Sequence, residues 1–435
     1  MIRGDPVPKE SEKRMRICRM RTAVGALLAL VLAGAGCSSS YSTRGTSTPT
    51  DRGSSAKPVY TIGVLTDLTG LLAADGKPVP VAVKAAEDMY NAQGYDLRYV
   101  VADDATSPTG ALTAAQELVR QDHVFAVIMV SAVGFAAAAY LTAQGIPVIG
   151  SSSDGPEWIT SRNMFSVTGT PRYSDVQTDT GDILELLGAH DYAVIGYGIS
   201  PSSADAARSE ATSAQLAGIH VGYLNANFPF GDTNVGPEVL AMKAAGVDSL
   251  GALVEQPTAF AILEGLKQQG VTLKVPLLSI GYGGDLLSAG PAALQTAKGA
   301  YFGVPMEPLE MGTSATRRFA QAMRTVGIAQ DQIEVNEYMG YASVAAFVSG
   351  LRAAGNDPTR AQFISAMLGI RKFNAAGLYG SHSVGFAMDQ RGQGAYGADD
   401  CSWLVRWSGS SFQLVPGADP ICGRNVPTQS AKAPG

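Results

Sequence analysis

The chain has 435 residues, of which 46% are hydrophobic and 16% charged, so it can fill a large core and is not disordered by composition. Its net charge is −6, and residues 1–36 alone carry +4, which leaves −10 for residues 37–435. An acidic chain without a basic stripe lacks the footprint that phosphate binding needs, so we expect no nucleic-acid partner.

The N-terminal segment has the pattern of an export signal. Several arginines precede an apolar run over residues 23–33, which is too short to span a bilayer and has the length of a signal-peptide core. The run ends in Leu-Ala-Gly-Ala-Gly-Cys, which resembles a bacterial lipobox and implies lipidation at Cys37. Gly34 departs from the usual lipobox residue, and a plain cleaved signal peptide is the alternative.

We therefore expect a lipoprotein signal peptide over residues 1–36. Residues 37–58 are rich in Ser and Thr and predict a flexible tether. The protein would lie outside the cytoplasm, attached to the bacterial cell membrane through a lipid on Cys37.

Strand and helix patterns alternate over the next hundred residues. The loop over 67–77 is rich in Gly, and the strand over 124–130 is a short β-branched apolar run. Regular alternation predicts an α/β fold with a doubly wound parallel sheet. The other expected strands are 59–66, 97–101, 147–149 and 165–168, and the expected helices are 78–93, 109–121 and 134–144.

Polar loops follow two consecutive strands of this sheet. Ser131 comes directly after the third strand, and a loop containing Ser152, Ser153 and Asp154 follows the fourth. The carboxyl ends of parallel strands form the ligand crevice of such folds. The pattern therefore predicts that these side chains face one crevice, although ordinary helix caps and turns would give the same residues.

A second alternation begins near residue 175 and predicts a second α/β sheet of similar size. Its expected helices are 175–187, 204–217, 235–245 and 258–269, and its expected strands are 192–197, 221–224, 249–254, 275–280 and 300–305. The last part is helical over 313–326, 336–354 and 359–368, and β-like over 384–388, 402–407 and 412–415.

Two cysteines, Cys401 and Cys422, remain near the C-terminus. In an exported protein they most simply form a disulfide. No second CxxC or histidine pair accompanies them, so we expect no metal. The chain also has no GxSxG, HExxH or P-loop motif, so we expect no enzyme, no catalytic residue and no cofactor. A secreted hydrolase would need a Ser, a His and an acid that converge, and none can be assembled.

Several short motifs occur together in a characteristic order. They are Ile-Gly-Val-Leu-Thr-Asp-Leu-Thr-Gly at 62–70, Asp-Asp-Ala-Thr-Ser-Pro at 103–108, and Gly-Ile-Pro-Val-Ile-Gly-Ser at 145–151. With them, residues 59–415 resemble the type I periplasmic-binding-protein family, in particular the branched-chain amino-acid-binding (leucine-binding) proteins of ABC importers. The resemblance implies two doubly wound Rossmann-like lobes joined by a three-strand hinge, with the ligand held between them.

The resemblance also implies the lobe boundaries. Lobe 1 would comprise residues 59–168 and 303–383, and lobe 2 residues 169–302 and 384–425. Residues 426–435 would form a disordered tail.

In the first lobe, the resemblance implies that the Ser131 hydroxyl holds a ligand carboxylate. Ser152, Ser153 and Asp154 would lie at the family's second carboxylate contact, and Asp75 stands where the family places an aromatic residue. Asp154 departs from the family pattern because it would repel a ligand carboxylate, unless it caps the local turn.

In the second lobe, the family's acidic residue for the ligand ammonium is missing. Tyr282 is the nearest polar side chain at that place, Glu255 could substitute for the acid, and Ser203 lies in the region that replaces a family aromatic. These departures leave a cationic or polyhydroxyl ligand as an alternative to an amino acid.

The expected function is capture of a small polar solute, an amino acid or a related compound, by a monomeric lipoprotein. The solute would close the two lobes about the hinge, and the closed protein would dock on an ABC transporter permease. The alternative is a ligand-sensing ectodomain that reports to a signalling partner.

Overall fold

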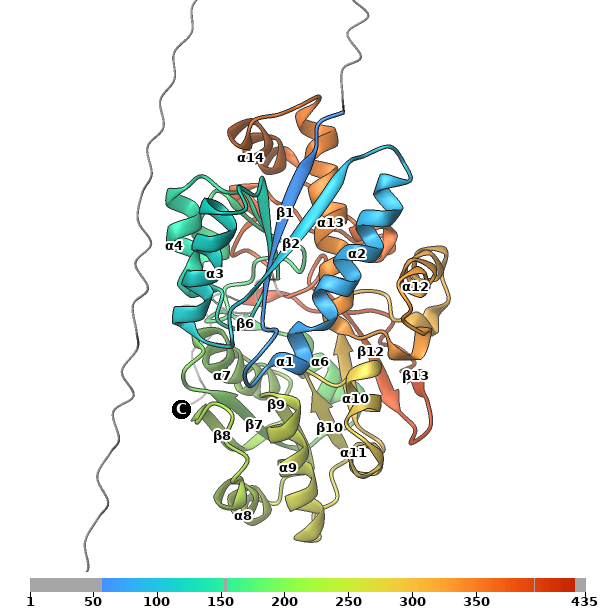
Figure 1. Cartoon of the computed structure of the whole chain (residues 1–435). Helices are drawn as coiled ribbons and strands as arrows, with labels where there is room; N and C mark the ends of the chain where they lie inside the picture. The colour runs from blue at the N-terminus through green and yellow to red at the C-terminus, as the bar shows by residue number, and fades with distance from the viewer. Residues whose placement is uncertain (1–56, 152–154, 395, 427–435) are drawn as a thin grey trace, which may run out of the picture. The chain divides into compact units, whose positions relative to one another are not determined.

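The computed structural model describes residues 57–151, 155–394 and 396–426, all within one compact unit, Ala56–Gly435 (Figure 1). Within these residues, no helix combines the length and apolar character that crossing a bilayer requires. The signal peptide, Cys37, the loop residues Ser152, Ser153 and Asp154, and residues 427–435 lie outside the described part of the chain.

The first sheet has five parallel strands in the order β2-β1-β3-β4-β5. Its order reverses between β1 and β3, which is the switch point where doubly wound folds bind ligands. Every residue of β3 is buried, as expected for a strand covered on both faces. The bounds are β1 Tyr60–Thr66, β2 Leu97–Asp103, β3 Ala126–Val130, β4 Val148–Gly150 and β5 Met164–Ser166.

The helices of this half follow the expected pattern, except that α1 and α5 were not expected. The segment predicted as the loop 67–77 contains a short helix, α1, so that part of the prediction was wrong. α3 begins where expected, because the Ser107 hydroxyl accepts a hydrogen bond from the Gly110 N–H at 3.0 Å. The bounds are α1 Ala73–Gly76, α2 Pro78–Asn91, α3 Pro108–Arg120, α4 Phe135–Ala143 and α5 Glu157–Thr160.

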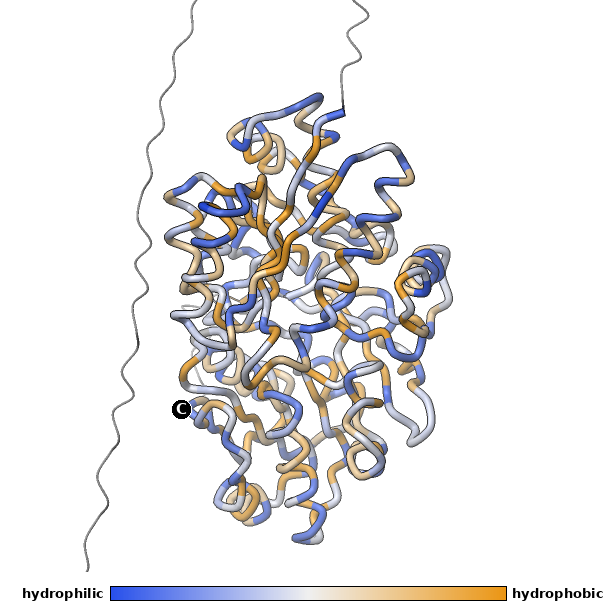
Figure 2. Tube along the Cα trace, in the orientation of Figure 1, coloured by the Kyte–Doolittle hydropathy of each residue, from blue (hydrophilic) through white to orange (hydrophobic). Residues whose placement is uncertain are grey.

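The second sheet repeats this winding. Strands β8-β7-β9-β10-β11 are parallel, and β12 and β13 extend the sheet in the antiparallel sense beyond β11. Its switch point lies between β7 and β9. Apolar residues concentrate along the strands of both sheets (Figure 2). The bounds are β7 Asp191–Tyr197, β8 His220–Phe228, β9 Ser249–Leu253, β10 Val275–Leu278, β11 Tyr301–Val304, β12 Cys401–Trp407, β13 Phe412–Leu414 and β14 Ile421–Cys422, which pairs with β12.

The chain passes between the sheets three times: after β5, after β11 and before β12. β11 lies wholly in the second sheet, although the expected lobe boundary at residues 302–303 falls inside it. After β11 the chain returns to the first half, where α13 packs on α2, β3 and β4. α13 is buried on nearly all sides, which explains why it is apolar all round rather than amphipathic.

The remaining helices are α6 Asp179–Leu186, α7 Pro201–Leu216, α8 Gly236–Ala245, α9 Gln256–Gln268, α10 Gly284–Ser288, α11 Pro291–Thr296, α12 Ser314–Thr325, α13 Val335–Ala354, α14 Arg360–Gly369, and the 3₁₀ helices η1 Leu309–Met311, η2 Gln330–Gln332, η3 Ala375–Gly377 and η4 Met388–Gln390.

Two further expectations of secondary structure were wrong. The helix expected to start at residue 175 starts at Asp179, because Val176–Gln177 forms β6 and pairs with β15, Asn425–Val426. The expected strand at 384–388 is a single bridge, in which Val384 exchanges backbone hydrogen bonds with Phe373 before the chain turns into η4. Both outcomes depend on partners distant in sequence.

Candidate functional site

A cavity of about 480 Å³ lies where the carboxyl ends of the two sheets face each other, a normal size for a small-molecule site. The first half contributes Asp67 after β1 and Ser131 after β3. The second half contributes Glu255 after β9 and Asp285 in α10, and Glu334 enters from the start of α13. Both switch points therefore open into one cavity.

Glycines bring the acidic elements of this cavity close together. A Cβ on Gly76 would lie 2.0 Å from the Asp67 carbonyl oxygen, so only glycine lets α1 pack on the end of β1 beside Asp67. A Cβ on Gly284 would lie 2.0 Å from the Gln332 carbonyl oxygen. This contact holds the loop after β10 against the residues that precede α13, and so brings Asp285 to Glu334.

We expect Gly284→Ala to destabilise the protein by about 1–3 kcal/mol, because the added methyl must displace backbone rather than a flexible side chain. Urea denaturation would measure the loss. Gly236→Ala is the control, because the added methyl meets open space at the start of α8 and should lower the free energy of unfolding far less. Gly290 also faces open space, but its positive φ makes it unsuitable. Equal effects of Gly284→Ala and Gly236→Ala would contradict the close packing at Gly284.

Three of the residues predicted for the site line the cavity with groups that remain open to a ligand. They are Ser131, Asp75 and Glu255. The Ser131 oxygen accepts the Val133 N–H at 3.1 Å, so its own hydroxyl proton can still be donated. The Oε2 atom of Glu255 is buried and accepts no hydrogen bond from the described protein.

Two other predicted residues line the cavity but have their hydroxyl groups engaged elsewhere. The Ser203 hydroxyl donates to the Leu253 carbonyl and accepts the Tyr197 N–H, both at 2.8 Å, which ties β7 to β9. The Tyr282 hydroxyl donates to Glu310 at 2.7 Å and accepts the Leu309 N–H at 3.0 Å. Both hydroxyls therefore hold the walls of the cavity together.

Sequence reasoning missed five acidic residues of the cavity: Asp67, Asp179, Glu210, Asp285 and Glu334. The position of Asp67 directly after the first strand was a usable signal, because it is the same kind of position as that of Ser131. Asp285 follows the Gly-Tyr-Gly-Gly turn after β10. Glu334 carries no such signal, because it precedes a helix and approaches the cavity only through the return of the chain after β11.

Asp67 is 3% exposed and stands beside the first switch point. Burial and the neighbouring Asp104 raise the pKa of Asp67 to about 8. Its Oδ2 atom accepts the Ala132 N–H at 3.4 Å, and its Oδ1 atom has no hydrogen-bond partner in the described protein. The backbone N–H next to Ser131 therefore points to a protein carboxylate.

Asp75 and Glu255 come from opposite halves and interact with each other. The charge of Asp75 acts on Glu255 across the cavity. Burial, followed by the charge of Asp75, raises the pKa of Glu255 well above its usual value. Burial also raises the pKa of Asp75.

Asp285 and Glu334 continue the acidic row. Burial and the charge of Asp75 raise the pKa of Asp285 to about 7, and its Oδ1 atom accepts a hydrogen bond from the Gln256 amide at 2.6 Å. Burial, with the charges of Asp285, Glu337 and Asp75, raises the pKa of Glu334 to about 10. Glu334 is 7% exposed, and its Oε1 atom has no partner in the described protein.

The cavity wall is unbalanced in charge. Among the described residues that line it, none is Lys, Arg or His, whereas seven are acids. Aromatic rings complete the second half of the wall, where Tyr197 and Phe230 meet edge to face at 5.0 Å and the Tyr197 hydroxyl accepts the Glu255 N–H. Such a wall fits a ligand that supplies the missing positive charge. The seven acids are Asp67, Asp75, Asp179, Glu210, Glu255, Asp285 and Glu334.

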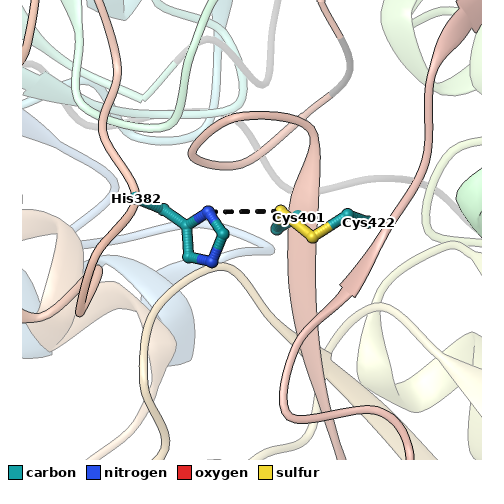
Figure 3. A group of neighbouring side chains, drawn as sticks. All are labelled: His382, Cys401 and Cys422. Carbon is teal, nitrogen blue, oxygen red and sulfur yellow. Dashed lines mark hydrogen bonds between the residues drawn. A yellow bond between two sulfur atoms is a disulfide. The ribbon is translucent and has the colours of Figure 1, made fainter.

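Cys401 and Cys422 form a disulfide, which joins β12 to β14 (Figure 3). The His382 Nδ1 atom lies 3.5 Å from the Cys401 sulfur. Within the described residues, this is the one group of three ligand-type side chains whose atoms lie close enough for a metal. The disulfide occupies both sulfur atoms, so no thiolate is available to bind an ion.

Comparisons with known proteins agree with this architecture. The sequence pattern of the periplasmic binding protein family matches residues 59–411, which confirms the prediction of a binding protein rather than an enzyme. An amino acid binding protein of Pseudomonas aeruginosa is 28% identical over 319 residues, which are 69% of this chain and 80% of that protein.

Solved structures share the fold at low sequence identity. A leucine binding protein, LivK, from Thermotoga maritima gives a TM-score of 0.69 at 17% identity, over 82% of this chain and 98% of that one. An ABC transporter solute binding protein from R. palustris, in complex with benzoate, gives 0.68 at 16% identity, over 86% and 99%. The two-lobed α/β fold expected from the sequence is thereby confirmed. With the family pattern spanning most of its length, the chain belongs to the periplasmic binding protein family.

Proposed function

We propose that this protein captures a small polar solute in the cavity between its two lobes and delivers it to an ABC importer. The observation that carries the proposal is the cavity itself, which collects the loops at the carboxyl ends of both sheets. A ligand that contacts both walls stabilises the closed arrangement by its differential affinity for that state. Residues 59–168 and 305–383 would form one lobe, and residues 169–304, which keep β11 whole, and 384–425 the other. A lipid on Cys37 would hold the protein at the membrane.

The similar proteins support this proposal because they are named as binding small solutes: an amino acid for the Pseudomonas aeruginosa protein and benzoate for the R. palustris protein. The site residues Ser131, Asp75 and Glu255 would contact the solute from the two lobes. Ser152, Ser153 and Asp154 stay proposed contacts in the first lobe, and Ser203 and Tyr282 would shape the wall.

Thermal unfolding with a solute panel would test the proposal. The panel contains amino acids, amines, sugars and aromatic acids. A ligand at 100 times its dissociation constant should add about 2.7 kcal/mol to the free energy of unfolding. A panel without any stabilising member would contradict the proposal.

A cavity-filling variant makes this test specific. Gly303 lines the cavity, and a Cβ added there meets no heavy atom within 4 Å. Gly303→Phe should therefore abolish the ligand-dependent shift. Gly369→Phe is the matched control, because Gly369 also faces open space but lies at the exposed end of α14. A retained shift in Gly303→Phe would place the solute outside this cavity.

A further inference from the structure

The acids of the cavity form an extended row that joins its two halves. The charges of Asp67, Asp75 and Asp285 all act on Glu255, and the charge of Asp75 also acts on Asp285. Asp285 and Asp75 in turn act on Glu334. Asp67 follows β1 of the first sheet and Glu334 precedes α13, so these two residues enter the cavity from different elements, and we call them the two ends of the row.

Both ends of the row carry an oxygen atom that lacks a partner. Asp67 Oδ1 and Glu334 Oε1 are buried and accept no hydrogen bond from the described protein, and both residues line the cavity. A buried polar oxygen without a partner costs free energy, and a positively charged donor from a ligand would let both carboxyl groups ionise with a partner. A ligand with two donor groups can satisfy both oxygen atoms at once.

A single metal ion does not fit the row either. A metal needs several ligand atoms that converge on one point. Among the described residues, no three carboxylates of the cavity have oxygen atoms that approach one another closely enough to share an ion. The spacing instead suits a ligand whose positive charges are spread along a chain.

The described lining of the cavity is also poorly suited to bind a ligand carboxylate. The Ala132 N–H beside Ser131 points to Asp67, and the described lining has no cationic side chain. A carboxylate at this place would compete with Asp67 for the Ala132 N–H and would oppose the ionisation of Asp67. The described wall therefore disfavours both amino acids and aromatic acids.

We propose that the cavity binds a linear organic cation with two or more amino groups, a diamine or polyamine. The inference rests on the proposed capture of a solute between the lobes and names the chemical class of that solute. One ammonium group would lie at Asp67, with Glu255 beside it, and another at Asp285 and Glu334. The methylene chain between them would pack along the aromatic wall at Tyr197 and Phe230.

Isothermal titration calorimetry with the full chain would test this class. The probes are putrescine, cadaverine and spermidine, with butylamine, 1,4-butanediol, leucine and benzoate as comparisons. We expect the diamines or spermidine to bind at least 10-fold more tightly than butylamine, because a second charge-assisted contact is worth roughly 10- to 100-fold in affinity. Butanediol has the same carbon chain as putrescine without the charges, and it should not bind measurably.

The variants Glu255→Gln and Glu334→Gln should each weaken polyamine binding by roughly 10- to 100-fold. Glu307→Gln is the matched control, because Glu307 is buried outside the cavity, where it accepts the Thr313 hydroxyl at 2.6 Å. It should leave the affinity within about threefold of the wild-type value, and thermal unfolding would verify that every variant is folded.

The outcomes separate the two proposals. Tight binding of leucine or benzoate without binding of any di- or polyamine would overturn the inferred class and leave the proposed capture of a solute intact. Equal affinities for butylamine and the diamines would overturn the need for two charges. No heat from any probe would count against both proposals.

Discussion

Glu334→Gln is expected to make the ligand-free protein more stable while it weakens polyamine binding. Glu334 is buried, and its pKa of about 10 means that the folded protein takes up a proton at neutral pH. Holding that proton at pH 7.5 costs at most about 4 kcal/mol relative to an unfolded chain with the ordinary pKa of 4.5. The amide of Gln needs no proton but stays buried, so we expect a net gain of about 1–3 kcal/mol.

Urea denaturation of the ligand-free protein would measure this gain, and calorimetry would measure the loss of affinity in the same preparation. Glu307→Gln should show neither effect, because its carboxylate already has a donor in Thr313. A gain in the free energy of unfolding together with a loss of affinity identifies a residue that serves binding at the expense of stability. A Glu334→Gln variant that is less stable than wild type would show that the carboxyl group has a structural role.

The ligand-free protein is also expected to lose stability as the pH rises from about 5 to 8. Asp285 has a pKa of about 7 and Asp67 of about 8, both far above the ordinary value of 3.8. The folded protein therefore keeps protons that the unfolded chain has released, so stability is fully present near pH 4 and is lost as the pH rises through these values. Each group contributes up to about 1.4 kcal/mol per pH unit between its two pKa values.

Other acids that line the cavity act in the same direction, since burial raises the pKa of Asp179 to about 6 and of Glu210 to about 7. Urea denaturation at pH 5, 6, 7 and 8 would measure the trend. Saturating spermidine should flatten or reverse it, because an organic cation stabilises the ionised carboxylates. A stability maximum near pH 8 without ligand would contradict the pKa shifts on which this prediction depends.

The fold could be predicted well from the sequence because most strands and helices have recognisable local patterns. The buried strand β3 and the capped helix α3 have signals within a few residues, and the order of the motifs supplied the two-lobed arrangement. The strand β6 had no such signal, because its partner Asn425–Val426 lies about 250 residues away. Local apolar patterns likewise could not show that Val384 makes only one bridge.

The site was predicted only in part. Ser131, Asp75 and Glu255 follow strands or early loops, and strand ends point to the crevice of an α/β fold. The use of the Ser203 and Tyr282 hydroxyls depends on which backbone atoms lie opposite them, and no sequence pattern shows that. Glu334 reaches the cavity through the crossover after β11, so its role becomes visible only in three dimensions.

The acidic lining of the cavity is the feature that selects the expected ligand. An acidic net charge is common and by itself selects no ligand. The collection of seven acids and no cationic side chain along the described wall of one cavity is a property of the fold, and it changes the expected ligand from an amino acid to an organic cation.

Calorimetric titration of spermidine into the full chain at pH 7.5, in phosphate and in Tris buffer, tests this account most directly. The two buffers differ in ionisation enthalpy, so the difference in observed heat counts the protons exchanged on binding. We expect binding with net release of protons, because the ammonium groups displace protons from Asp67 and Glu334. Binding without proton release, or no binding of spermidine, would contradict the claim that the acidic row recognises a polyamine.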